Sequence, residues 1–115
     1  MKRRTPESLV LHAILDYLAA ERVLAFRMQT GVAEIEGRRV VFGTPGMADI
    51  LACPDLLCDD GDCRPSYLWI EVKAARGAQS EFQRSFQAQV EDHGHDYLIA
   101  RSIDDVREYL GGHRG

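Results

Sequence analysis

Apolar residues near the N-terminus recur at the spacing of one helix face, and they comprise Val10, Leu11, Ile14, Tyr17 and Leu18. This spacing predicts an amphipathic helix. Thr5 followed by Pro6 supplies an N-cap residue and a proline at the first helical position. Glu7 falls at the N-terminal end of the apolar stripe. Its carboxylate either only favours the positive end of the helix dipole or points inward at a site.

Shorter apolar runs, separated by turn residues, predict strands in the next part of the chain. Gly31 and Gly37 interrupt these runs, and the three strands that we expect span residues 23–28, 32–35 and 39–42. Because the connections between them are short, we expect the three strands to form an antiparallel meander. A loop with two glycines and a proline follows, and a fourth strand is expected from about Ala48.

Residues 67–73 have the pattern of a β-strand, yet they include an acid and a base. Side chains alternate along a strand, so Glu71 and Lys73 share one face. Burying them is costly unless they are paired or bind a ligand. Asp49 raises the same question, because it is expected inside the strand that begins near Ala48. These charges either are a solvated outer face and a turn cap, or they form a site on adjacent strands.

The C-terminal part predicts a helix, a strand and a second helix. Ser80-Glu81-Phe82-Gln83 matches a capping box, in which Gln83 is the partner of Ser80, and the helix is expected to end near Gly94. A strand over residues 96–101 and a helix from 102 to 110 follow, with a frayed tail at 111–115. We therefore expect one α/β (α+β) domain over residues 1–115, with one mixed sheet and the order helix, strands, Asp49 strand, Glu71 strand, helix, strand, helix.

The composition limits the classes of protein. At 115 residues, with 45% hydrophobic and 28% charged residues, the chain has room for one ordinary domain core. It has no apolar run near the ~20 residues of a membrane span, and no apolar signal-peptide core follows its basic start. We expect a cytoplasmic protein that has no membrane partner and no small-molecule organic cofactor.

Three cysteines, Cys53, Cys58 and Cys63, lie in one acidic stretch. Their odd number argues against a disulfide framework. Their spacing is looser than that of zinc-binding pairs, and no histidine lies nearby to complete a tetrahedral set. They are interpreted as reduced thiols, with structural zinc as the alternative.

The net charge of −4 disfavours binding to nucleic acid, because phosphate contacts require Lys and Arg. The distribution of charge matters more, since several acids concentrate in the cysteine stretch. Basic residues that lie close in sequence to the expected site elements are candidate nucleic-acid contacts, and they are Lys2, Arg3, Arg4, Arg76 and Arg84.

Asp49 and Glu71 can face each other if their strands are neighbours. Two carboxylates and a backbone carbonyl, here that of Val72, are hard oxygen ligands suited to Mg²⁺. Glu7 could add a third carboxylate, directly or through water. Such an ion can activate a bound water and stabilise charge on a phosphate, while Lys73 holds the water or pairs with the phosphate.

Six features occur along the chain in a fixed order: Glu7, Thr30-Gly31, Gly46-x-Ala-Asp49, Ile70-Glu71-Val72-Lys73, Ser80-x-x-Gln83 and Gly94. On these residues the chain resembles the VRR-NUC family of the PD-(D/E)XK nuclease superfamily over roughly residues 5–110. It departs from the family at Ala48, where many members carry Pro, and at Thr30, where Asn is frequent. The family implies a restriction-endonuclease-like core and a Mg²⁺ or Mn²⁺ site.

In that family the residues at these positions have defined roles. The resemblance implies that Asp49, Glu71 and the Val72 carbonyl bind the metal and that Lys73 is the catalytic lysine. Glu7 and Gln83 are implied to be accessory site residues, with Glu7 in the metal shell.

The resemblance also implies a reaction and an assembly. Stand-alone members are similar to phage and bacterial proteins that are associated with cleavage of four-way (Holliday) DNA junctions as homodimers. We therefore expect a structure-specific DNA endonuclease that acts as a homodimer on branched DNA. Two alternatives stay open: a non-catalytic nucleic-acid-binding module on the same scaffold, and a small α/β domain with structural charges and a zinc-binding cysteine loop.

Overall fold

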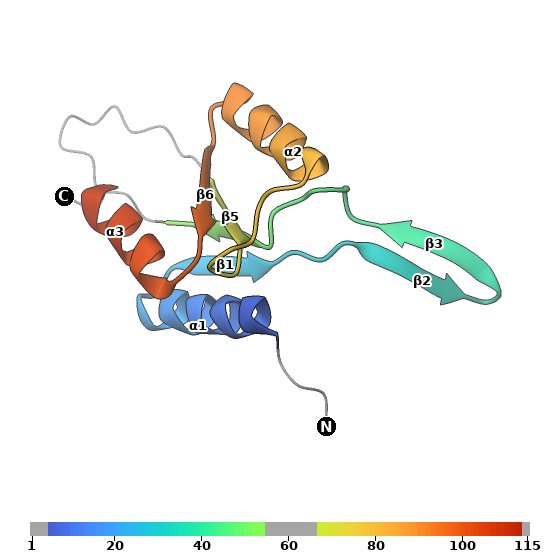
Figure 1. Cartoon of the computed structure of the whole chain (residues 1–115), viewed down its shortest axis with the longest axis horizontal. Coiled ribbons are helices and arrows are strands. Elements are labelled where there is room, and N and C mark those ends of the chain that lie inside the picture. Colours follow the sequence, from blue (N-terminus) through green and yellow to red (C-terminus); the bar gives the residue numbers. More distant parts are fainter. Residues whose placement is uncertain (1–4, 55–66, 114–115) are drawn as a thin grey trace.

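The computed structural model describes residues 5–54 and 67–113 of the chain (Figure 1). In this part of the chain, three helices and six strands follow one another in the order α1 (Pro6–Ala20), β1 (Leu24–Arg27), β2 (Gly31–Ile35), β3 (Arg38–Phe42), β4 (Ile50–Cys53), β5 (Leu68–Val72), α2 (Glu81–Asp92), β6 (Asp96–Ala100) and α3 (Ile103–His113). Every helix and strand expected from the sequence pattern is present. No helix of the described ranges is long and apolar enough to cross a membrane.

Four of the strands form a mixed sheet in the order β1-β4-β5-β6. The β1–β4 and β4–β5 pairs are antiparallel, and β5 and β6 are parallel. The mixed α and β architecture agrees with the expected class. The expected single sheet and three-stranded meander are wrong, because β1 pairs with β4 while β2 and β3 form a separate two-stranded sheet. The physical reason is burial: Ile50 and Ala52 of β4 are fully buried and lie between two strands, whereas β2 and β3 contain no buried residue.

Helices cover both faces of the four-stranded sheet. Helices α1 and α3 lie over one face, and α2 lies over the other (Figure 1). The first face carries the core, which consists of Leu11, Ile14, Leu18, Val23, Ile50, Ala52, Leu68, Ile70, Val72, Ala100, Val106 and Leu110. On the second face, Trp69 of β5 packs edge-on against Phe86 of α2, with ring centroids 5.0 Å apart. The alternation along β5 therefore places Glu71 beneath α2.

The boundaries of α1, α3 and β4 can be compared with those expected from the sequence. The Thr5 side chain caps α1 by accepting a hydrogen bond from the Ser8 N–H, at 3.1 Å. Helix α3 extends to His113, beyond the expected end at residue 110, because buried Val106 and Leu110 anchor its last turns. Strand β4 begins at Ile50, so Asp49 immediately precedes the strand instead of lying inside it.

The candidates Lys2, Arg3, Arg4, Cys58 and Cys63 lie outside the described residues.

Candidate functional site

Glu71 is the only charged residue that is buried in the described part of the chain, and its exposed fraction is 0%. Its Oε1 accepts hydrogen bonds from the Tyr97 hydroxyl and from Gln79 Nε2, the latter at 3.2 Å. Lys73 Nζ lies 3.9 Å from Oε2. Among the described residues, Oε2 has no hydrogen-bond partner. One oxygen of this carboxylate is thus fixed by two donors, and the other keeps its acceptor capacity unused.

The Gln79 side chain connects Glu71 to helix α2. Its Nε2 also donates to Oε1 of Gln87, at 2.9 Å. Its backbone carbonyl accepts a hydrogen bond from the Arg84 guanidinium, at 2.9 Å. These contacts hold the segment between β5 and α2 next to the buried carboxylate, because α2 supplies both outer partners.

Asp49 stands next to Glu71 in the register of the sheet. Strands β4 and β5 pair Ile50 with Ile70, so position 49 falls opposite position 71 one step further along. The Asp49 Oδ2 accepts a hydrogen bond from the Val72 backbone N–H, at 2.7 Å. Its own carbonyl accepts from the Met28 N–H, at 2.7 Å. The side chain therefore extends the β4–β5 pairing in place of a backbone carbonyl, and this fixes the carboxylate at the end of β5.

Burial raises the pKa of the Asp49 carboxyl above its usual range. The hydrogen bond from Val72 works in the opposite direction, as does the charge of Lys73. The charges of Glu7 and Glu71 raise the pKa further, because a second carboxylate disfavours ionisation. Asp49 therefore experiences the field of both other acids.

Gly46 explains how the loop before Asp49 reaches this position. Its φ angle is +81°, and a Cβ atom there would lie 2.2 Å from the carbonyl oxygen of Phe82. The loop thus packs directly against the first turn of α2, at a distance that only glycine permits. Ala48, which is 1% exposed, then anchors the chain before Asp49.

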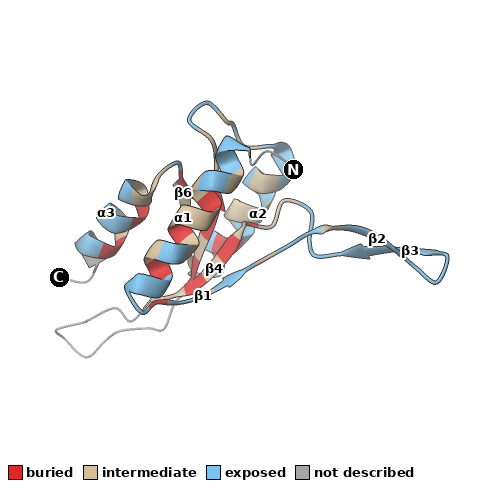
Figure 2. Ribbon diagram, turned by 90° about the horizontal axis from the view of Figure 1, so that it is seen from below, coloured by how far each residue is buried: buried red, intermediate tan, exposed pale blue. Residues whose placement is uncertain are grey.

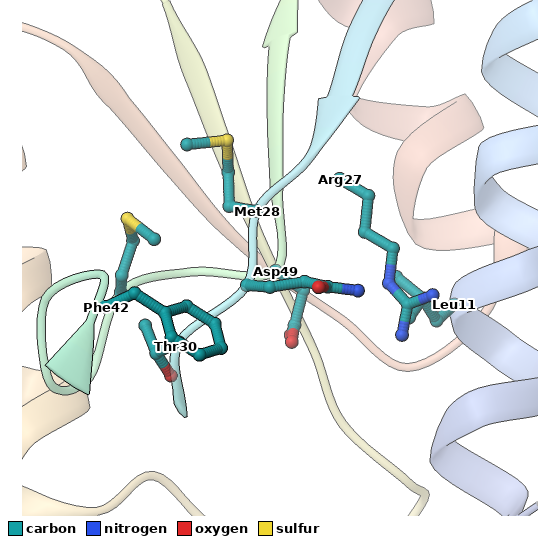
Figure 3. A pocket seen from close by; sticks show the side chains of 8 residues that line it. Leu11, Arg27, Met28, Thr30, Phe42 and Asp49 are labelled. Carbon is teal, nitrogen blue, oxygen red and sulfur yellow. The ribbon is translucent and has the colours of Figure 1, made fainter. Parts of the chain in front are cut away.

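Asp49 borders two hollows that share Leu11, Arg27 and Asp49 in their walls. The larger, of about 340 Å³, is completed by Met28, Gln29, Thr30, Phe42 and Met47 (Figure 3). The smaller, of about 200 Å³, is completed by Thr5, Glu7, Ser8 and Val72. Figure 3 shows Arg27 and Leu11 on one side of Asp49 and Thr30 and Phe42 on the other. Asp49 thus borders both hollows, and Glu7 borders the smaller one.

The three acids expected at the site are not gathered into one cluster. Glu7 is exposed in the first turn of α1 and lines the smaller hollow with Asp49. Glu71 lies on the opposite face of the sheet, beneath α2. Among the described residues, no group of three or more His, Cys, Asp and Glu side chains is placed to hold a metal ion. The structure therefore does not bring the three carboxylates into one set, because α1 and α2 pack on different faces of the sheet.

Gln83 has its capping role in the structure. Its side chain accepts a hydrogen bond from the Ser80 N–H, at 2.9 Å, and its own N–H donates to Ser80 Oγ, at 3.2 Å. The glutamine that contacts Glu71 is Gln79. Arg84 is engaged with the Gln79 carbonyl, while Arg76 is exposed in the turn after β5.

Sequence reasoning missed three residues near the two acids: Gln79, Tyr97 and Arg27. Tyr97 follows the alternation of β6 and lies on the same face as Glu71, so its phenol was a recognisable candidate partner. Gln79 directly precedes the capping box, and its position carries no comparable signal. Arg27 reaches the hollow only because β1 pairs with β4.

Comparison of the chain with protein-family models, with curated proteins and with solved structures found no match. The chemistry of the described side chains is therefore what bears on function. The carboxylates of Asp49 and Glu71 stand opposite each other in the β4–β5 register. The Lys73 amine and the exposed Arg27 guanidinium also border the end of β5. Such a set can hold a divalent cation through oxygen and can contact an anion through nitrogen.

Proposed function

We propose that this chain is a Mg²⁺- or Mn²⁺-dependent, structure-specific DNA endonuclease that hydrolyses phosphodiester bonds. In this proposal it has a restriction-endonuclease-like core and resolves four-way junctions as a homodimer. One observation carries the proposal: fully buried Glu71 keeps Oε2 without a hydrogen-bond partner in the described part of the chain, 3.9 Å from the Lys73 amine. An ionised oxygen in that situation is costly unless a cation or donor satisfies it.

The residues fit a hard divalent cation. Asp49, Glu71 and the Val72 carbonyl are oxygen donors of the kind that Mg²⁺ prefers. Burial and neighbouring acids raise the pKa of Asp49, and a bound cation would relieve that repulsion. When bound, such an ion lowers the pKa of a coordinated water and offsets charge on a phosphate. Glu7 borders the hollow beside Asp49 and would contribute through water.

The chain's own groups have separate tasks in this proposal. Tyr97 and Gln79 hold Oε1 of Glu71, so that Oε2 remains available. The Lys73 amine, which is 13% exposed, orients the attacking water or pairs with the scissile phosphate. Asp49 is kept in place by the Val72 N–H.

DNA binding by an acidic chain must depend on local positive charge. Arg27 is exposed and lines both hollows beside Asp49, and this supports the proposal that its guanidinium contacts a phosphate. A homodimer would present this group and the site twice, related by a two-fold axis. Two sites in that arrangement match the two symmetry-related strands of a four-way junction.

The proposal is tested with a synthetic four-way junction, a matched linear duplex and a supercoiled plasmid, each with Mg²⁺, with Mn²⁺ or with EDTA. We expect metal-dependent cleavage that favours the junction. Lys73→Met should lower the cleavage rate by about 100-fold or more, because it removes the amine and keeps the side-chain volume. Arg107→Met is the matched control, since Arg107 is paired with Asp104 on α3, across the sheet from α2. Absence of metal-dependent cleavage of every substrate would overturn the proposal.

A second candidate is a non-catalytic nucleic-acid-binding module. The observation that favours it is that Glu71 is fully buried and that the described acids do not form a three-membered group. In this case the carboxylate would serve only the Tyr97 and Gln79 contacts. Junction binding that is unaffected by EDTA, without cleavage of any substrate, would support this candidate.

A further inference from the structure

We infer that the larger hollow beside Asp49 receives a nucleobase that has left the base stack of DNA. The substrate class is then DNA with an unpaired or unstacked nucleotide next to the cleaved phosphate. This inference rests on the proposed nuclease and specifies which DNA that nuclease selects. It follows from the chemistry of the walls, from the backbone contacts that hold them in place and from the size of the hollow.

The apolar part of the wall suits the flat face of a base. Phe42 supplies an aromatic ring, and Met28 and Met47 supply flexible, polarisable thioethers. Phe42 ends strand β3 of the β2–β3 hairpin, whose strands contain no buried residue, and its side chain is 42% exposed (Figure 2). Stacking of a base on an aromatic side chain contributes about 1–3 kcal/mol and tolerates any base, since every base has an aromatic face. The exposed ring is therefore a surface on which a base of any kind can stack.

The polar part of the wall suits the edge of a base and its phosphate. Gln29 and Thr30 carry both hydrogen-bond donors and acceptors, which base edges require. Arg27, in the same wall, carries a guanidinium that can pair with a phosphate. A purely apolar ligand would remove these groups from water without replacing their hydrogen bonds, which is costly. A nucleotide provides an aromatic face, a polar edge and an anion, so it matches all parts of the wall.

Close backbone packing holds the aromatic and polar walls next to each other. The φ angle of Gly43 is +77°, and a Cβ atom there would lie 2.6 Å from Thr30 Cγ2 and 2.7 Å from the Gln29 carbonyl oxygen. The chain after Phe42 thus packs directly on the polar wall, at a distance that only glycine permits. The Phe42 ring in turn lies over Gly31, where an added Cβ would be 2.9 Å from the ring. Walls that are already in place lower the cost of ordering them when a ligand binds.

The size of the hollow restricts its occupant to a base outside the duplex. Its volume of about 340 Å³ is near the lower end of the roughly 300–1,000 Å³ typical of small-ligand pockets, so it suits a single base and not a stretch of duplex. A base must therefore leave the stack to enter. This costs a few kcal/mol, and least where the nucleotide is mismatched or already single-stranded. The hollow therefore favours branch points, bulges and strand ends over continuous duplex.

The test measures the binding of three intact synthetic DNAs, in EDTA and again with Ca²⁺. They are a duplex with one bulged adenine, the same duplex with an abasic residue at the bulge, and the continuous duplex. We expect the wild type to bind the adenine bulge about tenfold or more tightly than the abasic bulge. Fluorescence anisotropy at one fixed salt concentration measures the dissociation constants. A wild type that binds none of these DNAs, or that binds the adenine and abasic bulges equally, would overturn the inference.

Two variants assign the preference to the hollow. Phe42→Leu should remove the preference for adenine, because it removes the aromatic face and keeps an apolar side chain. Phe26→Leu is the matched control, since Phe26 is 50% exposed, adjoins Arg27 on β1 and is not among the residues that line the hollow. We expect this variant to keep the preference, and equal preferences in the two variants would overturn the inference. Circular dichroism verifies that both variants fold.

Cleavage with Mg²⁺, measured on the same preparations, separates this inference from the proposed function. An adenine preference that is lost only in Phe42→Leu, in a protein that cleaves no DNA, would support the base-binding hollow and overturn the nuclease. Metal-dependent cleavage by the wild type, together with equal affinity for the adenine and abasic bulges, would support the nuclease and overturn the base-binding hollow.

Discussion

The Tyr97 hydroxyl, on β6, donates a hydrogen bond to Oε1 of Glu71 on the parallel neighbour β5. Burial raises the pKa of the Tyr97 phenol, and the Glu71 carboxylate raises it further. The phenol therefore remains protonated, and remains a donor, across the physiological pH range. This contact determines which oxygen of the buried carboxylate is left for another ligand.

Replacing Tyr97 by Phe removes the hydroxyl and keeps the ring. We expect the free energy of unfolding to fall by about 1–3 kcal/mol, because the buried Glu71 loses one of its donors. Urea denaturation at pH 7 measures the change. Tyr67→Phe is the control, since Tyr67 is 49% exposed. A loss of similar size in both variants would contradict a specific role for the Tyr97–Glu71 contact.

Replacing Asp49 by Asn should change how stability depends on pH. The Asp49 pKa is raised on folding, so the folded state holds the proton more tightly than the unfolded state. Stability from this group is therefore lost as pH rises through the window between the usual value of 3.8 and the raised folded pKa. The amide of Asn can still accept from the Val72 N–H, but it carries no charge.

The metal-free Asp49→Asn variant should therefore gain stability relative to wild type as pH rises from about 4 to 7. Denaturant midpoints at several pH values, in EDTA, measure this difference. In the proposed nuclease, the cleavage rate of this variant should fall by about 100-fold or more, because a proposed metal ligand is lost. A stability difference that shrinks with rising pH would contradict the raised pKa.

Replacing Gly46 by Ala should destabilise the protein by about 1–3 kcal/mol. The new Cβ would meet the Phe82 carbonyl at 2.2 Å, and the φ angle of +81° disfavours any side chain. Gly94→Ala is the matched control, because Gly94 has a φ angle of +83° and nothing within 4 Å of an added Cβ. Thermal unfolding of the two variants separates the steric cost from the φ cost. Equal losses would show that the approach to α2 is not tight.

A divalent cation should stabilise the protein. A ligand that binds only the folded state adds about 2.7 kcal/mol at 100 times its dissociation constant. We expect Mg²⁺ or Mn²⁺ to raise the unfolding midpoint of the wild type, and EDTA to reverse the change. Glu71→Gln should abolish this shift while preserving side-chain volume. Glu108→Gln, on α3, is the control. An unfolding midpoint of the wild type that changes with neither metal would contradict the proposed metal site.

The sequence by itself determined the local structure of this protein. Helix α1 follows from the apolar spacing after Thr5 and Pro6, and α2 follows from the capping box at Ser80 and Gln83. These signals act between residues no more than a few positions apart, so they can be recognised without knowledge of the fold. The alternation of side chains over residues 67–73 likewise puts Glu71 and Lys73 on one face, whichever strands pair with this segment.

Only the tertiary structure decided which distant segments meet. The pairing of β1 with β4 depends on the burial of Ile50 and Ala52 between two strands, a requirement that no local pattern expresses. The same holds for Glu71, whose partners Gln79 and Tyr97 are selected by the packing of α2 and β6 around it. Glu7 lies on the other side of the sheet because α1 packs there. Side-chain chemistry is local, but its neighbours are set by how the whole chain buries its apolar surface.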